Sequence, residues 1–294
     1  MNKIDLDYLR TWIGKSRSDK DLISCRHARL LAATLDYSSP EEITDGESLP
    51  PLWHWTCFLE GAPTHGLGND GHPARGGFMP PVALPNRMWA GGRVSFLSPL
   101  RIGSTVRKES SILSVDHKVG HSGDLVFVTV LHELKSSLGD LLIREEQDIV
   151  YKGTNPHGQQ PVSAPVAAHA SQFSWKYTPT STTLFRYSAL TFNGHRIHYD
   201  VDYCRETEGY QNLVIHGPLN ATMLAGYAEE ISGSRLSSFS YRGLSPALLG
   251  NSITIHADIL DGCITLYAVL DDGAICMRAE AFTENGNKPS HKEH

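Results

Sequence analysis

Apolar and polar residues alternate along two groups of segments, one in each half of the chain. The alternation is clear in Val126-Phe127-Val128-Thr129-Val130 and in Ile264-Thr265-Leu266-Tyr267-Ala268. A period of two residues predicts β-strands with one buried face, and the Gly- or Asp-rich turns between segments predict antiparallel neighbours. The expected strands are Lys108–Val115, Asp124–Leu134, Leu141–Tyr151, Ser252–Leu260, Cys263–Leu270 and Ala274–Thr283.

A repeated sequence precedes each group of strands and indicates an internal duplication. Ser95–Gly103 parallels Arg242–Gly250, and the Ser-Pro pairs in the two segments lie 147 positions apart. A short helical stretch comes earlier in each half, at Arg26–Asp36 and at Phe185–Asn193. We therefore predict two copies of one α+β unit. The expected parts are an N-terminal unit at 1–152, a linker at 153–170, a C-terminal unit at 171–285 and a polar tail at 286–294.

The two copies differ in the helix that should follow the short helical stretch. Gly217–Ser232 carries apolar residues at helical spacing, which predicts a largely apolar helix. The segment 147 positions earlier, at about Asp70–Pro85, is rich in glycine and proline and cannot form a continuous helix. We expect the first half to have a degenerate helix and a loop that leaves room for a ligand, with the chemistry kept in the second half.

Composition and charge exclude several classes of function. A net charge of −6 over 294 residues argues against a nucleic-acid-binding surface. No apolar run approaches the roughly 20 residues needed to span a bilayer. The five cysteines are scattered without a Cys-x-x-Cys pair, and the N-terminus lacks the apolar core of a signal peptide. These features favour a reduced cytoplasmic protein without disulfides or a zinc site.

The best candidate for chemistry is a polar turn rich in histidine, Phe192–Asp200, which is followed by His216-Gly217-Pro218. An imidazole has an unperturbed pKa of about 6.5 and can transfer protons near neutral pH. A turn dense in imidazole between apolar segments and ahead of a helix start is suited to acid–base chemistry on a bound small molecule.

This duplicated unit with its histidine turn resembles the MaoC-like enoyl-thioester hydratases and dehydratases, whose motif runs Gly-Asp-x-Asn-Pro-x-His. The resemblance implies an α+β double hot-dog fold, and it is greatest for the subgroup with a FAS1-like dehydratase N-terminal half. That subgroup includes itaconyl-CoA and mesaconyl-C4-CoA hydratases. The likeness is carried by Leu184–Asn193, His195–Asp200, Gly209–Leu219 and Met88–Arg93.

The motif can be carried over residue by residue. His198 matches the motif histidine, Asn193 the aspartate, and His195-Arg196 the Asn-Pro pair. The resemblance implies proton transfer by His198, with Asn193 orienting the water or the ring, because an amide can neither take a proton nor hold an imidazolium. Gly217 can donate its backbone N–H to the thioester oxygen at the start of a helix. The residues expected to contact substrate are Arg186, Tyr187, His195, Arg196, His216 and Arg242.

The implied reaction is the reversible addition of water to the conjugated double bond of a small dicarboxylic enoyl-CoA, either itaconyl-CoA or mesaconyl-C4-CoA. A 3-hydroxyacyl-thioester dehydratase of fatty-acid metabolism, a hot-dog thioesterase and a non-catalytic acyl-thioester sensor remain alternatives. We expect no cofactor other than the coenzyme A of the substrate, no metal, no nucleic-acid or membrane partner, and a homodimer.

Simpler structural roles remain open for several of these residues. His198 could pack in an ordinary turn, and His195 could only brace it. A metal pair of His195 and His198 lacks partner ligands at a suitable spacing. Asp200 is expected to cap the next helix. Gly217 could be a simple turn glycine.

Other polar residues are expected to be solvated. His65 and His72 flank Asp70 in a Gly-rich loop, where contact with water is the expected state. Arg186 and Arg242 could be surface charges. Three further arginines could meet the phosphates of coenzyme A, but the sequence does not separate them from solvated residues: Arg75, Arg87 and Arg93.

Overall fold

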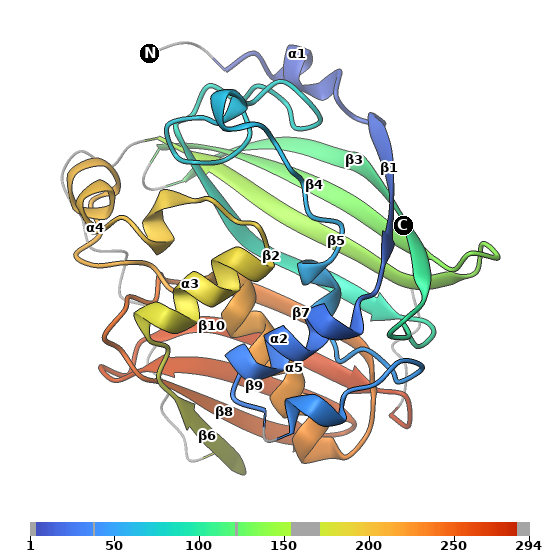
Figure 1. Cartoon of the computed structure of the whole chain (residues 1–294). Coiled ribbons are helices and arrows are strands. Elements are labelled where there is room, and N and C mark those ends of the chain that lie inside the picture. Colours follow the sequence, from blue (N-terminus) through green and yellow to red (C-terminus); the bar gives the residue numbers. More distant parts are fainter. Residues whose placement is uncertain (1–3, 38, 121–122, 154–170, 287–294) are drawn as a thin grey trace.

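In the part of the chain that the structure describes, ten antiparallel strands form one sheet in the order β1-β3-β4-β5-β2-β7-β10-β9-β8-β6 (Figure 1). The computed structural model describes residues 4–37, 39–120, 123–153 and 171–286, so most of the expected linker and tail lie outside the described residues. The strands are β1 (Ser16–Leu22), β2 (Asn86–Phe96), β3 (Thr105–Gly120), β4 (Gly123–Lys135), β5 (Leu141–Lys152), β6 (Phe173–Tyr177), β7 (Leu236–Gly243), β8 (Ile253–Leu260), β9 (Cys263–Leu270) and β10 (Ile275–Thr283).

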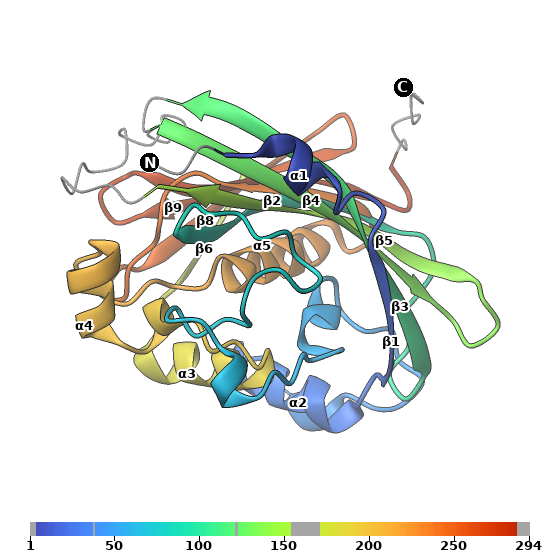
Figure 2. The same cartoon turned by 90° about the horizontal axis from the view of Figure 1, so that it is seen from above.

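Three of the helices lie on one face of this sheet. Figure 2 shows α5 next to the sheet, with α2 and α3 farther from it on the same side. None of the helices in the described part of the chain is long and apolar enough to cross a membrane. The α-helices are α1 (Leu6–Arg10), α2 (Cys25–Thr34), α3 (Ser181–Leu190), α4 (Val201–Tyr203) and α5 (Gly217–Ser232), and a π-helical turn spans Cys204–Glu208. Single 3-10 turns are at Pro40–Glu42, Trp53–Thr56, Thr64–Gly66 and Arg196–His198.

The order of strands confirms the predicted duplication. Each half contributes five strands in the same relative order, and the two halves meet where β2 pairs with β7. The two Ser-Pro segments form the same contacts. The backbone N–H groups of Leu97 and Ser98 donate to the Leu142 carbonyl at the start of β5, and those of Leu244 and Ser245 donate to the Cys276 carbonyl at the start of β10.

The six strands expected from alternation are present as β3, β4, β5, β8, β9 and β10. The other four strands were not predicted. β1 and β6 are polar or short edge strands, and β2 contains the pair Gly91-Gly92. A Cβ at Gly92 would lie 2.6 Å from the Glu146 carbonyl oxygen on β5, so this close approach needs glycine.

The first half lacks a helix equivalent to α5, as expected, but the equivalent point in the sequence is not the one that was expected. The Leu49 N–H donates to the Leu100 carbonyl as the Ile215 N–H donates to that of Ala247, so these two points of the chain are equivalent. The single 3-10 turn at Trp53–Thr56 therefore stands where α5 begins in the second half. The segment at 70–85, where the lost helix was expected, belongs instead to a long connection to β2. The offset of 147 residues fails here because the loops after α2 and α3 differ in length.

The predicted helix of the second half has the expected bounds. α5 spans Gly217–Ser232, with Pro218 in its first turn and Gly233 in the left-handed conformation at its C-terminal end. Its apolar residues, such as Leu219 and Leu224, are buried against β7, β9 and β10. This packing places the N-terminus of α5 beside the junction of the two halves.

Candidate active site

A cavity of about 720 Å³ lies between the two halves of the chain. Its walls come from the histidine turn, the first turn of α5, strands β2 and β5, and the connection between Cys57 and Met79. Among the expected site residues, the cavity is lined by Tyr187, Asn193, His195, His198 and Gly217.

The histidine turn is fixed by local hydrogen bonds. The chain leaves α3 through Phe192 in the left-handed conformation, with φ 48°. The Oδ1 atom of Asn193 then accepts the backbone N–H of His195 at 3.0 Å, and a single 3-10 turn follows at Arg196–His198. Asn193 thus closes the turn with its carbonyl oxygen, and its amide nitrogen, which has no hydrogen-bond partner among the described residues, can donate.

His198 has the geometry of a general base. Its Nδ1 lies 2.7 Å from the carbonyl oxygen of Val214, and because a carbonyl can only accept, Nδ1 carries the proton and Nε2 has a free lone pair. Burial lowers the pKa of His198 to about 4. The ring is therefore neutral at pH 7 and can accept a proton there.

His216 supports His198 from behind. Its ring stacks on that of His198 with centroids 3.6 Å apart, and its Nε2 lies 2.9 Å from the Ser188 hydroxyl. The residue is fully buried and is not part of the cavity wall, and burial holds its pKa well below the usual range. It was expected to contact substrate, but the structure places it beneath the ring that lines the cavity.

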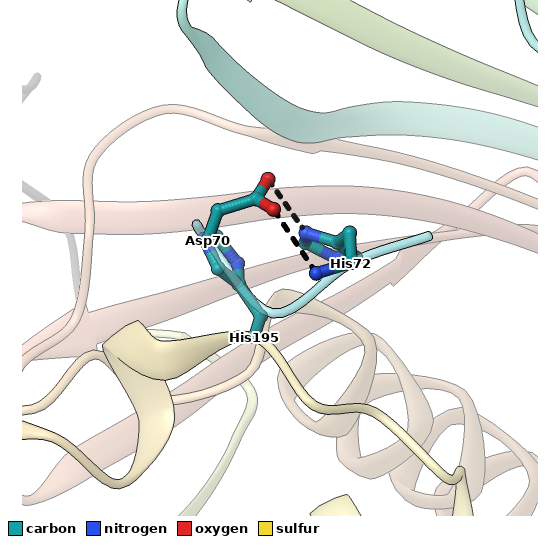
Figure 3. A group of neighbouring side chains, drawn as sticks. All are labelled: Asp70, His72 and His195. Carbon is teal, nitrogen blue, oxygen red and sulfur yellow. Dashed lines mark hydrogen bonds and ion pairs between the residues drawn. The ribbon is translucent and has the colours of Figure 1, made fainter. Parts of the chain in front are cut away.

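A loop of the first half reaches the histidine turn. The backbone N–H of Arg196 donates to the Asp70 carbonyl at 2.9 Å, and the rings of His72 and His195 lie 4.3 Å apart. The Asp70 carboxylate accepts hydrogen bonds from both the backbone N–H and Nδ1 of His72, at 3.0 and 3.1 Å (Figure 3). His65 is exposed as expected. The solvated state expected for Asp70 and His72 is wrong, because both are partly buried at this contact.

The charges of this loop reflect its setting. Although burial opposes it, the hydrogen bonds from His72 hold the pKa of the Asp70 carboxyl well below its usual range. Burial lowers the pKa of His72, the contact with Asp70 raises it, and the nearby charge of Arg87 lowers it further. Burial also lowers the pKa of His195, to about 2. At neutral pH the Asp70 carboxylate is therefore charged, and the neighbouring imidazoles of His72 and His195 are neutral.

Asp70, His72 and His195 also offer three ligand atoms that all lie within 4.8 Å of one another. This is a different group from the pair of His195 and His198 considered from the sequence. Spacing along the chain could not reveal it, because its members come from both halves.

The start of α5 is packed tightly beneath β2. A Cβ at Gly217 would lie 2.9 Å from Cε3 of Trp89, so a side chain here would displace the indole. Gly217 lines the cavity at the first residue of α5, where backbone N–H groups have no partner within the helix. This position suits a donor to an oxyanion.

Most of the arginines considered from the sequence have other partners or lie away from the cavity. Arg186 and Arg242 are exposed and do not line it. Arg196 pairs with Asp200 at 2.8 Å, and Asp200 also caps α4, as expected.

Arg75, Arg87 and Arg93 differ in their partners. Arg75 donates to backbone carbonyls of its own loop, among them that of Val82, and Arg93 pairs with carboxylates on β5. Arg87 lines the cavity and forms no ion pair with any of the described residues. It is therefore a cation without an ion pair in the described part of the chain, close to the histidines and to the Tyr151 hydroxyl.

A second polar cluster in the cavity wall was not found from the sequence. Glu145 of β5 is buried and accepts hydrogen bonds from His54 and from the Trp55 indole, each at 2.9 Å. The alternation of β5 places Glu145 on the inward face, and that signal could have identified it.

These features agree with comparisons to known proteins. The family model described as hydroxyacyl-thioester dehydratase type 2 matches residues 52–249, which include the loop at Asp70, the histidine turn and the start of α5. The chain belongs to this family and is a hydro-lyase. It is similar to the mesaconyl-C(4)-CoA hydratase of Chloroflexus aurantiacus, with 42% identity over 275 residues that cover 89% of this chain and 97% of that enzyme.

Solved structures show the same fold. A MaoC-like dehydratase from Phytophthora capsici superimposes with a TM-score of 0.71 at 15% identity, covering 96% of this chain and 100% of that one. A Mycobacterium tuberculosis protein described as a double hot-dog fold has a TM-score of 0.56 at 11% identity, covering 92% and 96% of the two chains. At these identities the likeness concerns the fold, and it confirms the predicted α+β double hot-dog.

Proposed function

We propose that the protein is an enoyl-CoA hydratase that adds water reversibly to a small dicarboxylic enoyl-CoA, with mesaconyl-C4-CoA as the first candidate substrate and itaconyl-CoA as the second. The observation that carries the reaction type is the neutral, buried His198, which lines a cavity beside the start of α5 and has its Nε2 unprotonated. The similarity to a mesaconyl-C(4)-CoA hydratase supports the substrate class.

The proposed reaction starts from a water molecule held at Nε2 of His198. The water oxygen bonds to the β carbon of the enoyl group while its proton moves to Nε2. The electrons of the double bond shift to the thioester oxygen, which the Gly217 N–H stabilises. The α carbon then takes the proton back from His198. The free amide nitrogen of Asn193 donates a hydrogen bond that orients the water.

Arg87 is the feature that favours a dicarboxylic substrate. In mesaconyl-C4-CoA the second carboxylate is attached to the carbon that water attacks, so it must lie near the histidines. Arg75 and Arg87 both line the cavity without an ion pair among the described residues, but Arg75 is held by backbone carbonyls of its own loop. The charge of Arg87 lowers the pKa of His195. A partly buried guanidinium of this kind can bind a carboxylate in a bidentate way.

Further parts of the proposal follow from the family. We propose that coenzyme A carries the acyl group, that the enzyme needs no cofactor or metal, and that it acts as a cytoplasmic homodimer. A dehydratase acting on linear 3-hydroxyacyl thioesters is the second candidate function, because the matching family model carries that description.

The test is hydration of mesaconyl-C4-CoA, itaconyl-CoA, crotonyl-CoA and a long-chain enoyl-CoA by the parent enzyme, by His198→Ala and by the control His65→Ala. We expect a dicarboxylic thioester to react fastest and His198→Ala to lower kcat by about a hundredfold or more. Exposed His65 should be dispensable.

The other outcomes decide between the alternatives. Hydration of linear chains alone would support the dehydratase of fatty-acid metabolism. Release of free coenzyme A would show a thioesterase. Full activity in His198→Ala would remove this residue from the reaction.

A further inference from the structure

The motif of the family places a carboxylate where this chain has Asn193, yet a carboxylate lies close by on a different part of the fold. Asp70 belongs to the long first-half connection that replaces the central helix. Its backbone carbonyl accepts the N–H of Arg196, and the carbonyl of the preceding Asn69 accepts from the Arg196 guanidinium at 3.1 Å. The loop is thus bonded directly to the histidine turn.

The loop at Asp70 and the histidine turn approach each other closely through a pair of glycines. Gly71 has a φ of +85°, and a Cβ there would lie 1.9 Å from the carbonyl oxygen of Gly194. A Cβ at Gly194 would in turn lie 2.9 Å from the Gly71 carbonyl oxygen. Only two glycines allow the backbones to meet in this way. The position of Asp70 and His72 relative to the histidine turn is therefore fixed by backbone contacts.

Asp70 and His72 form a dyad at this point. Nδ1 of His72 lies 3.1 Å from the Asp70 carboxylate, which can only accept, so Nδ1 carries the proton and Nε2 has a free lone pair. His72 lines the same cavity as His195 and His198, whereas Asp70 does not. His72 and His198 therefore border one cavity from opposite halves of the chain, and neither Nε2 has a hydrogen-bond partner within the described ranges.

We propose that the Asp70–His72 dyad takes the place of the missing motif aspartate in orienting the reacting water. This inference rests on the proposed hydratase function. One hydrogen of the water is directed to Nε2 of His198, which takes it as the oxygen bonds to the β carbon and returns it to the α carbon. The other hydrogen bonds to Nε2 of His72 and stays on the oxygen, becoming the hydroxyl of the product. Asp70 is a positioning residue that acts through His72.

Asp70, His72 and His195 together could hold a cation, but the positive charge of Arg87 opposes cation binding at this place. The guanidinium of Arg87 is close enough to lower the pKa of Asp70, His72 and His195. A divalent cation at this place would meet that positive charge, whereas a water molecule would not.

The experiment compares steady-state rates of the parent, Asp70→Asn, His72→Gln, His72→Leu and the control His65→Leu on the best thioester. Asn keeps the size of Asp70 and leaves its backbone bond to Arg196 intact. We expect Asp70→Asn to lower kcat about tenfold or more with KM within threefold of the parent. His72→Leu should lose about a hundredfold, and His72→Gln, which restores an acceptor oxygen, should be at least about tenfold faster than His72→Leu.

Each result separates the inference from the function on which it rests. Equal kcat for Asp70→Asn and the parent, or equal rates for the Gln and Leu variants, would overturn the dyad while leaving the hydratase intact. A parent that hydrates none of the thioesters would overturn the function and the dyad together. Stoichiometric zinc that is lost in Asp70→Asn, with activity removed by a chelator, would assign the three side chains to a metal and also overturn the dyad.

Discussion

Asn193 keeps its place in the turn although it lacks the chemistry of a carboxylate. Its Oδ1 accepts the His195 N–H, a bond that an aspartate would form equally well. The sequence predicted both the turn and the missing charge at this position. It could not predict Asp70 as a neighbour, because the contact depends on backbone packing between Gly71 and Gly194, and a Gly-rich loop has no periodicity that reports burial.

The charge of Arg87 at the cavity wall leads to a prediction about substrate choice. Arg87→Gln should raise KM for a dicarboxylic enoyl-CoA about tenfold or more, since a charge-assisted hydrogen bond to the substrate contributes about 1.5–3 kcal/mol. KM for crotonyl-CoA, which has no second carboxylate, should change little. Arg93→Gln is the matched control, because Arg93 is a β2 arginine paired with Glu146 and Asp148 away from the cavity. Equal changes in KM for both substrates would argue against a carboxylate contact.

At the scale of elements, the accuracy of prediction follows the strength of the local signal. α5 was predicted at its actual bounds because apolar spacing, Pro218 and Gly233 all act within one segment. β1 was missed because its sequence is polar, and its structure depends on pairing with β3 along the whole of Ser16–Leu22. The lost helix was misplaced because a fixed offset of 147 residues does not hold across loops of unequal length.

The connection that replaces this helix can be tested through its glycine contact. Gly71→Ala should displace the loop, because it adds a side chain at φ +85° and a Cβ 1.9 Å from a carbonyl oxygen. We expect destabilisation of about 1–3 kcal/mol in urea unfolding and a fall in kcat of tenfold or more. Gly61→Ala, where a Cβ would meet nothing within 4 Å, should match the parent in both measurements. Unchanged kcat in Gly71→Ala would show that the loop is not needed for the reaction.

At the scale of the whole molecule, the duplication was predicted correctly and the shared cavity was not. Repeats in sequence define two similar units, but they do not say how the units face each other. The answer lies in the pairing of β2 with β7, which involves Gly91 and Arg242 and has no sequence pattern of its own. The homodimer stays a prediction.

The buried histidines make the stability of the molecule depend on pH. Burial lowers the pKa of His132 and His198 to about 4 and that of His195 to about 2, so the folded protein binds fewer protons than the unfolded chain below pH 6.5. These neutral imidazoles therefore make their full contribution to the free energy of unfolding above about pH 6.5. As the pH falls toward 4, the free energy of unfolding decreases by about 1.4 kcal/mol per pH unit for each histidine.

Urea unfolding at intervals between pH 7.5 and 4.5 would measure this dependence. His132→Gln should make the slope shallower by about one proton, because it removes one of the imidazoles with a lowered pKa. A free energy of unfolding that stays constant over this range would contradict the low pKa values.

The two halves that meet where β2 pairs with β7 belong to one chain, so each chain contains one complete cavity. A site assembled from two separate chains would come apart on dilution, whereas a tethered pair has a local concentration that does not depend on the amount of protein. The tether also removes a constraint on evolution. In a symmetric pair every mutation appears twice, but here a change at Asp70 has no copy in the second half, so each half can specialise independently.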